Sequence, residues 1–457
     1  MDKLIKNGII VNADATVSGD VLIQNGIVAR IGDDIEHSGA DVIDAKGKFV
    51  MPGGVDVHTH FNLDLGNIKA QDDFYSGTVA AACGGTTCIV DYPGFGPKGC
   101  DLYHQIEQYR FEAKGQAVID YGLHGIFQHV NQEIIDEIQS LVDAGIYSFK
   151  GYLTYAGKLD DQALLRALSQ VKKVGGLFTV HAENDAIIEF LRDRFLAQEK
   201  KSPHYHALSR PARCEAEAVG RMIHLAAIAG NAPLYVVHLS SALGLAAVKT
   251  AQAVGQPVFA ETCPQYLLLN EDRYDEPDLG GLKYIMSPPL RKKADNAALW
   301  QGIREGHIEV VATDHCPFDF TKKKALGGRD FSRCPGGVPG VELRIPLIFS
   351  EGVGKKRISL TRFVDITATS PARIMGLYPK KGIIAPGSDA DIILMDPNRS
   401  RTVTHKMLHE NVDYTPYEGF TVQGWPMLTM VRGHVVAKDG NFVGEKGFGK
   451  FVKRKIA

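Results

Sequence analysis

The stretch "GVDVHTH" (54–60) decides how the fold of this chain is interpreted. It begins as a short apolar strand and closes on two histidines. Residues two apart on a strand point to the same side, so His58 and His60 can present both imidazoles to one metal ion. An H-x-H pair is equally compatible with two structural histidines satisfied inside a core. The rest of the chain has to separate these interpretations.

Seven further apolar stretches follow, each separated from the next by a segment long enough for a helix. They are "TTCIVDY" (86–92), "VIDYGLHGI" (118–126), "YSFKGY" (147–152), "LFTVH" (177–181), "LYVVH" (234–238), "PVFAETC" (257–263) and "EVVATD" (309–314). Eight β/α units over about 260 residues predict an α/β fold of the TIM (β/α)8 barrel type. A doubly wound open sheet is the alternative, but no Gly-rich dinucleotide motif follows the first strand.

The two chain ends have a different texture from the middle. Short alternating stretches separated by Asn-Gly and Lys-Gly turns fill residues 1–50, and similar stretches return at 381–397 and 429–440. This pattern is typical of antiparallel hairpins. We therefore predict a small β-sandwich domain built from residues 1–52 plus 381–457, beside a hydrolase barrel of residues 53–380. For the basic, Gly-rich end "GFGKFVKRKIA" we predict a solvated tail, with docking on a neighbouring subunit as the alternative.

Composition narrows the class of protein. The 457 residues carry a formal net charge of -2 and are 44% hydrophobic. This balance provides no electrostatic basis for binding nucleic acid or an anionic membrane. The start lacks a signal-peptide apolar block, no apolar run reaches the roughly 20 residues of a membrane span, and the seven cysteines show no paired spacing. We expect a soluble, cytoplasmic protein.

Three more predicted strands end in a polar group that follows an apolar run. "FTVH" ends at His181, "YVVH" at His238 and "VVATD" at Asp314. The carboxyl ends of barrel strands form the face on which barrel active sites are built. Imidazole and carboxylate together suit zinc or a similar divalent ion. Unrelated core residues explain such a convergence poorly, so we predict a metal site.

Lys150 ends the fourth strand and belongs to the same ring. Two unit charges about 4 Å apart repel by roughly 4 kcal/mol at an effective dielectric near 20, and a dication doubles this, so an ammonium is excluded beside metal ions. A neutral amine has one lone pair and can bind one metal. A lysine carbamylated by carbon dioxide is an anion with two oxygens, which can bridge two. The alternative is a snorkelling lysine in a salt bridge.

Several longer motifs carry a family resemblance. They are "PGGVDVHTHF", "FKGYLTY", "TVHAEN", "VVHLS", "ETCPQYLLL", "SPPLR", "TDHCPF" and "KGIIAPGSDADIIL". Together they resemble the hydantoinase/dihydropyrimidinase branch of the cyclic amidohydrolases, in the same order and over essentially the whole chain. The resemblance implies a distorted TIM barrel, a homotetramer and two Zn²⁺ per subunit. By resemblance, the more buried zinc is bound by His58, His60 and Asp314, the other by His181 and His238, and carboxylated Lys150 and a hydroxide bridge both.

The resemblance also implies the reaction, which is hydrolysis of 5-substituted hydantoins or dihydropyrimidines to N-carbamoyl amino acids. Metal-bound water is acidified toward neutrality and attacks a ring carbonyl. Asp314 acts as general base and then as general acid toward the departing ring nitrogen. Tyr155 matches the family tyrosine that donates a hydrogen bond to the developing oxyanion. Read without the family, Tyr155 is also compatible with an aromatic core residue.

Further positions are expected to bind the substrate. Ser287 matches a backbone contact to the ring amide, and Gly336 stands where the family often has Asn, in a contact made through the main chain. The ring substituent is expected to meet Leu63, Leu65 and Tyr152, which favours a hydrophobic or aryl substituent. These three residues are also compatible with simple loop packing. Cys316, close to Asp314, is expected either to line the pocket or to be an inert buried thiol. His315 is expected to contact the metal ligands and not to bind metal itself.

Other members of the wider group remain alternatives. Dihydroorotase has an Arg soon after H-x-H that holds the substrate carboxylate, whereas here Phe61 and Asn62 follow His60, which leaves an acidic substrate without a bidentate partner. Allantoinase fits Tyr155 and "SPPLR" less well. The collapsin response mediator proteins keep the fold but have lost ligands and act as structural partners. The intact ligand set here favours an enzyme.

Overall fold

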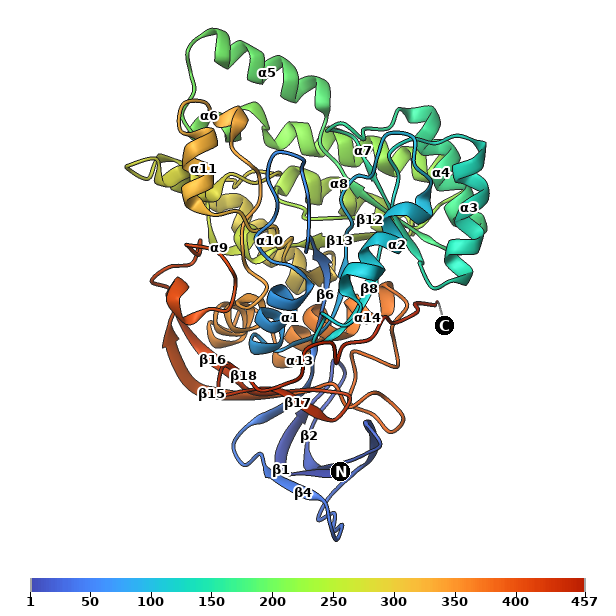
Figure 1. The fold of residues 1–457 in the computed structure, drawn as a ribbon, viewed down its shortest axis with the longest axis vertical. Helices are drawn as coiled ribbons and strands as arrows, with labels where there is room; N and C mark the ends of the chain where they lie inside the picture. The colour runs from blue at the N-terminus through green and yellow to red at the C-terminus, as the bar shows by residue number, and fades with distance from the viewer. Residues whose placement is uncertain (1, 456–457) are drawn as a thin grey trace.

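The computed structural model describes residues 2–455, and its two chain ends meet in one sheet (Figure 1). Its strands are β1 (Lys3–Val11), β2 (Thr16–Gln24), β3 (Ile27–Gly32), β4 (Asp41–Asp44), β5 (Phe49–Pro52), β15 (Ile392–Thr402), β16 (Thr421–Val431), β17 (His434–Lys438) and β18 (Asn441–Phe442). They follow the order β18-β17-β16-β15-β5-β1-β2-β3, with β4 paired to β1. The two ends join where β5 lies antiparallel to β15, with Met51 opposite Ile393. The predicted joining of both ends in a β domain is confirmed.

Local turn chemistry explains the hairpins of this sheet. Asn25 and Gly26 connect β2 to β3 with φ of 52° and 81°, and Asp439 and Gly440 connect β17 to β18 with φ of 54° and 82°. Two successive positive-φ residues match the right-handed twist of the strands on either side. The Asn-Gly turn that the sequence predicts is therefore present.

The middle of the chain forms a barrel of parallel strands. These are β6 (Gly54–Thr59), β7 (Thr86–Asp91), β8 (Asp120–Leu123), β9 (Gly125–Ile126), β10 (Ser148–Tyr152), β11 (Leu177–His181), β12 (Leu234–Val236), β13 (Val258–Thr262) and β14 (Val310–Val311). The third predicted strand is split into β8 and β9 by His124. Strands β6 to β8 and β9 to β14 form two parallel sheets, and a bridge from Thr59 to His315 links β6 to the segment after β14. The predicted distorted barrel is confirmed.

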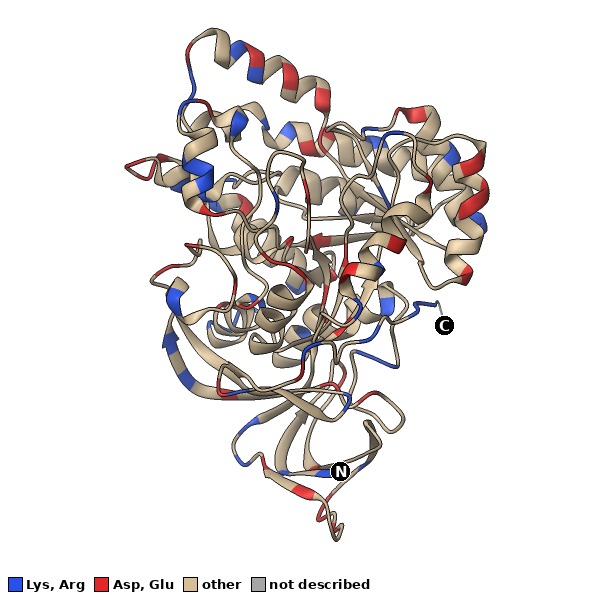
Figure 2. Cartoon of the chain, in the orientation of Figure 1, with Lys and Arg blue, Asp and Glu red and all other residues tan. Residues whose placement is uncertain are grey.

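Helices surround the barrel strands. They are α1 (Phe74–Cys83), α2 (Leu102–Ala113), α3 (Gln132–Asp143), α4 (Asp161–Lys173), α5 (Asp185–Ala197), α6 (His204–Ser209), α7 (Ala212–Ile228), α8 (Ala242–Ala253), α9 (Pro264–Leu268), α10 (Lys293–Glu305), α11 (Phe320–Gly327), α12 (Arg344–Ile348), α13 (Leu360–Val364) and α14 (Ser370–Ile374). In α3, Asn131 caps the N-terminus, and Ile134, Ile138 and Leu141 form the buried face. None of the described helices has the length and apolar character needed to cross a bilayer. Figure 2 shows Lys and Arg interspersed with Asp and Glu along these helices.

The C-terminal segment differs from its predicted role. Val452 donates its backbone N–H to Tyr121 O at 2.8 Å, and Phe451 forms a parallel bridge with Tyr121 of β8. Arg454 is 2% exposed and donates to Ser148 Oγ of β10 at 2.8 Å. It also donates to Leu123 O, where β8 ends. The prediction of a solvated tail is wrong, because the guanidinium satisfies polar groups at the seam between the two barrel sheets.

Candidate metal centre and substrate cavity

The predicted ligands lie together at the carboxyl ends of the barrel strands. His58 and His181 lie at or near the ends of β6 and β11, while His238 and Asp314 lie just after β12 and β14. Lys150 is the middle residue of β10 and does not end the strand as predicted, because the strand continues to Tyr152. His238 and Asp314 adopt positive φ values of 39° and 52°. For residues other than glycine this backbone conformation costs of order 1–3 kcal/mol and is concentrated at functional sites. The turns after β12 and β14 thus hold both side chains toward the barrel axis.

Three of these residues form a compact group. The Nε2 atoms of His58 and His60 each lie 3.2 Å from Asp314 Oδ1, and the possible ligand atoms of the three residues all lie within 4.8 Å of one another. Burial raises the pKa of Asp314, but the neighbouring His58 and His60 outweigh this and hold the pKa well below its usual range. Two imidazoles and an ionised carboxylate are a donor set that suits zinc.

The other two histidines face each other beside this group. His181 Nδ1 and His238 Nε2 are 2.8 Å apart, and the ring centroids of His58 and His238 are 5.4 Å apart. His238 Nδ1 is buried and has no hydrogen-bond partner among residues 2–455. Burial lowers the pKa of His58, His181 and His238, which favours the neutral imidazole that binds metals. Neutral imidazole nitrogens therefore lie close together at the barrel mouth.

Lys150 closes the ring without a counter-ion. Its side chain is 1% exposed, and Nζ lies 3.2 Å from His58 Nε2 and 3.9 Å from the ring centroid of Tyr92. No carboxylate of the described residues lies within ion-pair distance of this amine. Burial lowers the pKa of Lys150 to about 8. Within residues 2–455, the alternative of a snorkelling Lys150 in a salt bridge is therefore excluded.

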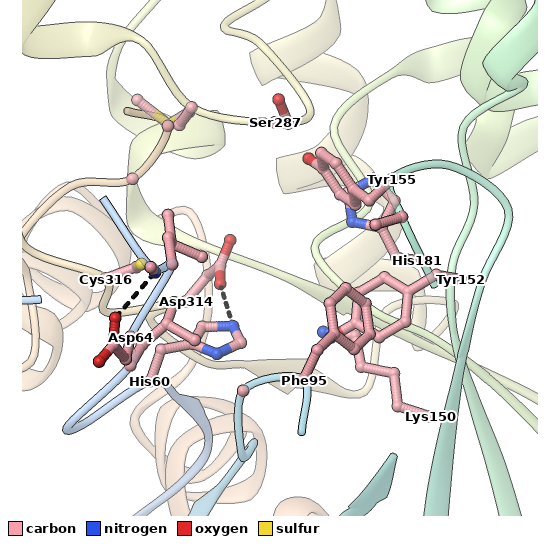
Figure 3. Close-up of a pocket in the computed structure, with 18 of the residues that line it drawn as sticks. His60, Asp64, Phe95, Lys150, Tyr152, Tyr155, His181, Ser287, Asp314 and Cys316 are labelled. Carbon is pink, nitrogen blue, oxygen red and sulfur yellow. Dashed lines mark hydrogen bonds and ion pairs between the residues drawn. The ribbon is translucent and has the colours of Figure 1, made fainter. Parts of the chain in front are cut away.

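A cavity of about 910 Å³ opens above the ring. Its lining includes these predicted residues: His60, Leu63, Leu65, Lys150, Tyr152, Tyr155, His181, His238, Ser287, Asp314, Cys316 and Gly336. His58 lies beneath the others and is completely buried, and His315 lies outside the cavity, with Nε2 3.0 Å from Asp72 Oδ2. Figure 3 shows Tyr155, Ser287 and Asp314 projecting into the same space. Tyr155 has a φ of 71° and is 40% exposed, so the aromatic-core alternative does not describe it.

A protein-family model described as "Amidohydrolase family" matches residues 49–436 of this chain. The chain belongs to the amidohydrolase family. D-Phenylhydantoinase of Escherichia coli O1:K1 / APEC is 55% identical over 456 residues, which cover 100% of this chain and 98% of that relative.

Solved structures place this amidohydrolase in one branch of the family. A crystal structure of D-hydantoinase matches with a TM-score of 0.98 at 43% identity, and dihydropyrimidinase from Brevibacillus agri with 0.98 at 44%; both matches cover 100% of this chain and 99% of the other. L-Hydantoinase (dihydropyrimidinase) from Arthrobacter aurescens matches with 0.90 at 33%, covering 99% and 100%. The chain is thus a cyclic amidohydrolase of the hydantoinase/dihydropyrimidinase type, as its motifs predict.

Two buried glutamates that sequence reasoning missed contact the predicted ligands of this amidohydrolase. Glu261 Oε1 lies 2.6 Å from His58 Nδ1 and accepts the backbone N–H of His238 at 3.0 Å. Glu183 Oε2 lies 2.9 Å from His181 Nε2 and accepts from Arg210 Nη1 at 2.6 Å. Because a carboxylate accepts, each imidazole donates outward and keeps its other nitrogen free for the centre.

Both glutamates have a signal in the sequence. Glu261 occurs in "PVFAETC", near the carboxyl end of a strand where neighbouring strands carry histidines. Glu183 lies two residues after His181, in "TVHAEN". A search for polar residues at every strand end, not only for histidine and aspartate, finds them.

A second cluster among the described residues does not compete with this site. It contains Cys83, Glu342 and His409. Glu342 already accepts from His409 Nδ1 at 2.9 Å and from the His409 backbone N–H at 2.6 Å. The remaining donors, Cys83 Sγ and His409 Nε2, are 3.9 Å apart. Two donors are too few for a closed zinc site.

Proposed function

We propose that this amidohydrolase hydrolyses the cyclic amide bond of 5-substituted hydantoins, and of dihydropyrimidines, to N-carbamoyl amino acids. The observation that carries the proposal is the ring of buried imidazole, amine and carboxylate groups at the floor of a substrate-sized cavity. Cavities of about 300–1,000 Å³ typically hold small ligands. The names of the relatives, D-phenylhydantoinase and dihydropyrimidinase, support the substrate class.

Two zinc ions fit the donors on this chain. His58, His60 and Asp314 would hold one ion, and His181 and His238 the other. The free Nδ1 of His238 and the facing nitrogens of the two histidines support this assignment. When bound, zinc supplies Lewis acidity, which polarises a carbonyl and makes water acidic near neutral pH.

Lys150 would join the two halves as a carbamate. The neutral amine attacks carbon dioxide, an N–C bond forms, and one proton leaves to solvent. The lowered pKa of Lys150, about 8 through burial, makes the neutral amine accessible near neutral pH. The resulting anion has two oxygens, whereas the amine has one lone pair, so only the carbamate can serve both ions.

Asp314 and Tyr155 would carry out the proton and oxyanion steps. Asp314, which its lowered pKa keeps ionised, would accept a proton from the attacking water as general base and pass it to the departing ring nitrogen as general acid. Tyr155 donates its phenol hydrogen to the carbonyl oxygen as negative charge develops there. Burial raises the pKa of Tyr155, so the phenol keeps this proton at neutral pH.

The rest of the cavity would hold the ring and its substituent. Ser287 and Gly336 offer main-chain groups to the cyclic amide on one side of the cavity. Leu63, Leu65 and Tyr152 form an apolar and aromatic wall, which suits a hydrophobic or aryl substituent at the 5-position.

An acidic substrate is less well served by this cavity. Of the arginines that line it, Arg210 is committed to Glu183 at 2.6 Å and Arg192 lies 3.0 Å from Asp193. Each guanidinium therefore already has a carboxylate partner, and an acidic substrate would have to compete with it. This supports the hydantoinase assignment over dihydroorotase.

A substrate panel tests the proposal. Purified protein is given phenylhydantoin, dihydrouracil, allantoin and dihydroorotate, and the N-carbamoyl products are quantified with the enantiomers resolved. We expect phenylhydantoin or dihydrouracil to react fastest, and elemental analysis to find about two zinc ions per chain. Fastest turnover of dihydroorotate would overturn the substrate assignment, and less than one zinc per chain would overturn the metal assignment.

We also propose, from the family resemblance, a cytoplasmic homotetramer. Light scattering of the purified protein should then return four times the chain mass of 49.8 kDa. A monomer or dimer at working concentration would contradict it.

A further inference from the structure

Lys323 is a buried lysine that lies outside the metal ring. It belongs to the short helix α11, between Lys322 and Lys324, which are both exposed. Lys323 itself is 0% exposed. Its ammonium donates to Gly337 O at 2.6 Å, to Ile285 O at 3.0 Å and to Lys283 O at 3.4 Å. A lysine ammonium has three N–H donors, and each has a main-chain acceptor here.

No carboxylate of the described residues pairs with Lys323, so its charge is balanced by carbonyl dipoles and by the Tyr414 ring, whose centroid lies 5.9 Å from Nζ. Burial lowers the pKa of Lys323 to about 8, which reflects the cost of holding a cation in this place. A methionine of similar length would fill the same space without that cost. The feature that only the lysine adds is the set of three bonds to main-chain carbonyls.

Those carbonyls come from two loops that line the substrate cavity. Ile285 and Ser287 lie in the first loop, and Gly336 and Gly337 in the second. The loops also contact each other directly, through the Gly337 N–H and Ile285 O at 3.0 Å. Ser287 and Gly336, the proposed main-chain contacts to the cyclic amide, each lie within two residues of a carbonyl that Lys323 holds.

The helix that carries Lys323 is itself fixed in place. Asp413 accepts the backbone N–H groups of Phe320 and Thr321 at 2.6 and 3.1 Å, and the Thr321 hydroxyl at 2.7 Å. This satisfies N–H groups in the first turn of α11 that have no partner inside the helix. Lys323 therefore reaches the two loops from a fixed support.

We propose that Lys323 is a positioning residue that clamps loops 283–287 and 336–338 together, so that their main-chain groups meet the ring amide of the substrate. This inference rests on the proposed function, because it assigns Lys323 to the same cavity. The amine does not touch the cavity, so its effect would pass through the loops. Loss of the clamp should weaken substrate binding and leave the metal ring intact.

The test compares Lys323→Met with Lys322→Met, an exposed neighbour on the same helix. With phenylhydantoin as probe, we expect KM to rise at least fivefold in Lys323→Met while kcat changes less than twofold and zinc content stays at the wild-type value. Hydrogen exchange read by mass spectrometry should quicken in segments 283–288 and 335–338 and nowhere else. Lys322→Met should match wild type in every measurement.

Separate outcomes identify which idea fails. If wild type hydrolyses none of the panel substrates, the proposed function fails, and the exchange pattern still reports on the clamp. If wild type is active and Lys323→Met keeps its KM within twofold, or exchanges uniformly faster, the clamp is wrong. Should Lys323→Met not fold, Lys323→Gln, whose amide keeps two donors, is measured in the same way, and an unchanged KM there overturns the proposal.

Discussion

Lys150 and Lys381 are two lysines that are both 1% exposed, and they have opposite surroundings. Lys381 Nζ lies 2.6 Å from Asp120, 2.7 Å from Asp391 and 2.9 Å from Asp389. Burial lowers the pKa of Lys381, but the three carboxylates outweigh it and raise the pKa well above its ordinary value. Among the described residues, Lys150 has a histidine nitrogen and two aromatic rings beside its amine but no paired carboxylate, and burial lowers its pKa to about 8.

The difference separates a structural cation from a reactive amine. Lys381 links Asp120 on β8 to the carboxylates just before β15, so it joins the barrel to the sheet domain. Lys150 lies at the other end of the barrel, where none of the described carboxylates pairs with it and where the more distant Asp314 and Glu261 do not offset its burial. A buried lysine with anions around it favours the ammonium, and one without them favours a neutral, modifiable amine.

The substitution with the largest expected effect removes the reactive amine. Lys150→Ala should lower kcat/KM by about 10⁴-fold or more, because zinc chemistry supplies several kcal/mol and every 1.36 kcal/mol is tenfold in rate. Zinc content should fall in parallel. Added short carboxylic acids should restore part of the activity by replacing the bridging oxygens.

A labelling experiment checks the same residue without activity. ¹³C NMR of protein loaded with ¹³C-bicarbonate and zinc should show one carbamate signal that is absent in Lys150→Ala and present in Lys381→Met. Full zinc content and activity in Lys150→Ala would reverse the assignment of the two lysines.

Removal of the structural cation should act on stability instead. Lys381→Met removes the cation that Asp389 and Asp391 share with Asp120, although Asp120 keeps Arg432 as a partner, and breaking a buried ion pair typically costs about 3–5 kcal/mol. Thermal unfolding should show a clear loss of Tm at an unchanged zinc content per folded chain. Lys380→Met, at the exposed neighbouring position, is the matched control and should leave Tm unchanged. An unaltered Tm in Lys381→Met would show that the cluster does not hold the two domains together.

The sequence predicts the surroundings of Lys150 much better than those of Lys381. The eight strands and the ligands at their ends follow from local alternation and from barrel geometry, so His58, His181 and Asp314 can be found by reading each strand to its end. The pairing of Lys381 with Asp120 cannot be found in this way, because Asp120 lies 261 positions away and only the folded chain brings it near.

The C-terminal tail also differs from its predicted role because its partners are distant in sequence. "GFGKFVKRKIA" is basic and rich in glycine, which is typical of a solvated end. Arg454 is nevertheless buried against Ser148, because the seam between the two barrel sheets offers acceptors that only the three-dimensional structure reveals. The local sequence pattern predicts the strands and the residues at their ends. Contacts between residues that are far apart in the sequence can be found only from the folded structure.

A smaller effect on activity is expected for Tyr155, which would contact the substrate but would support neither Lys150 nor Lys381. Tyr155→Phe should lower kcat by about 10²-fold, the usual loss when one oxyanion donor is removed. Zinc content and Tm should both stay at their wild-type values, unlike those of the two lysine variants. A fall in zinc content would instead place Tyr155 among the supports of the metal ring.

The smallest effect is expected at Gly336, where the family often has Asn. A Cβ built on Gly336 meets only Met286 Cα, at 3.9 Å, so Gly336→Asn should fit and change kcat/KM and Tm little. Gly337 is the matched contrast, because its φ is 147° and a Cβ there would collide with Cys316 O. Gly337→Ala should therefore displace the loop that Lys323 holds and raise KM. If Gly336→Asn and Gly337→Ala have the same KM, the position of this loop does not control substrate binding. Lys323 would then have a purely structural role, like Lys381.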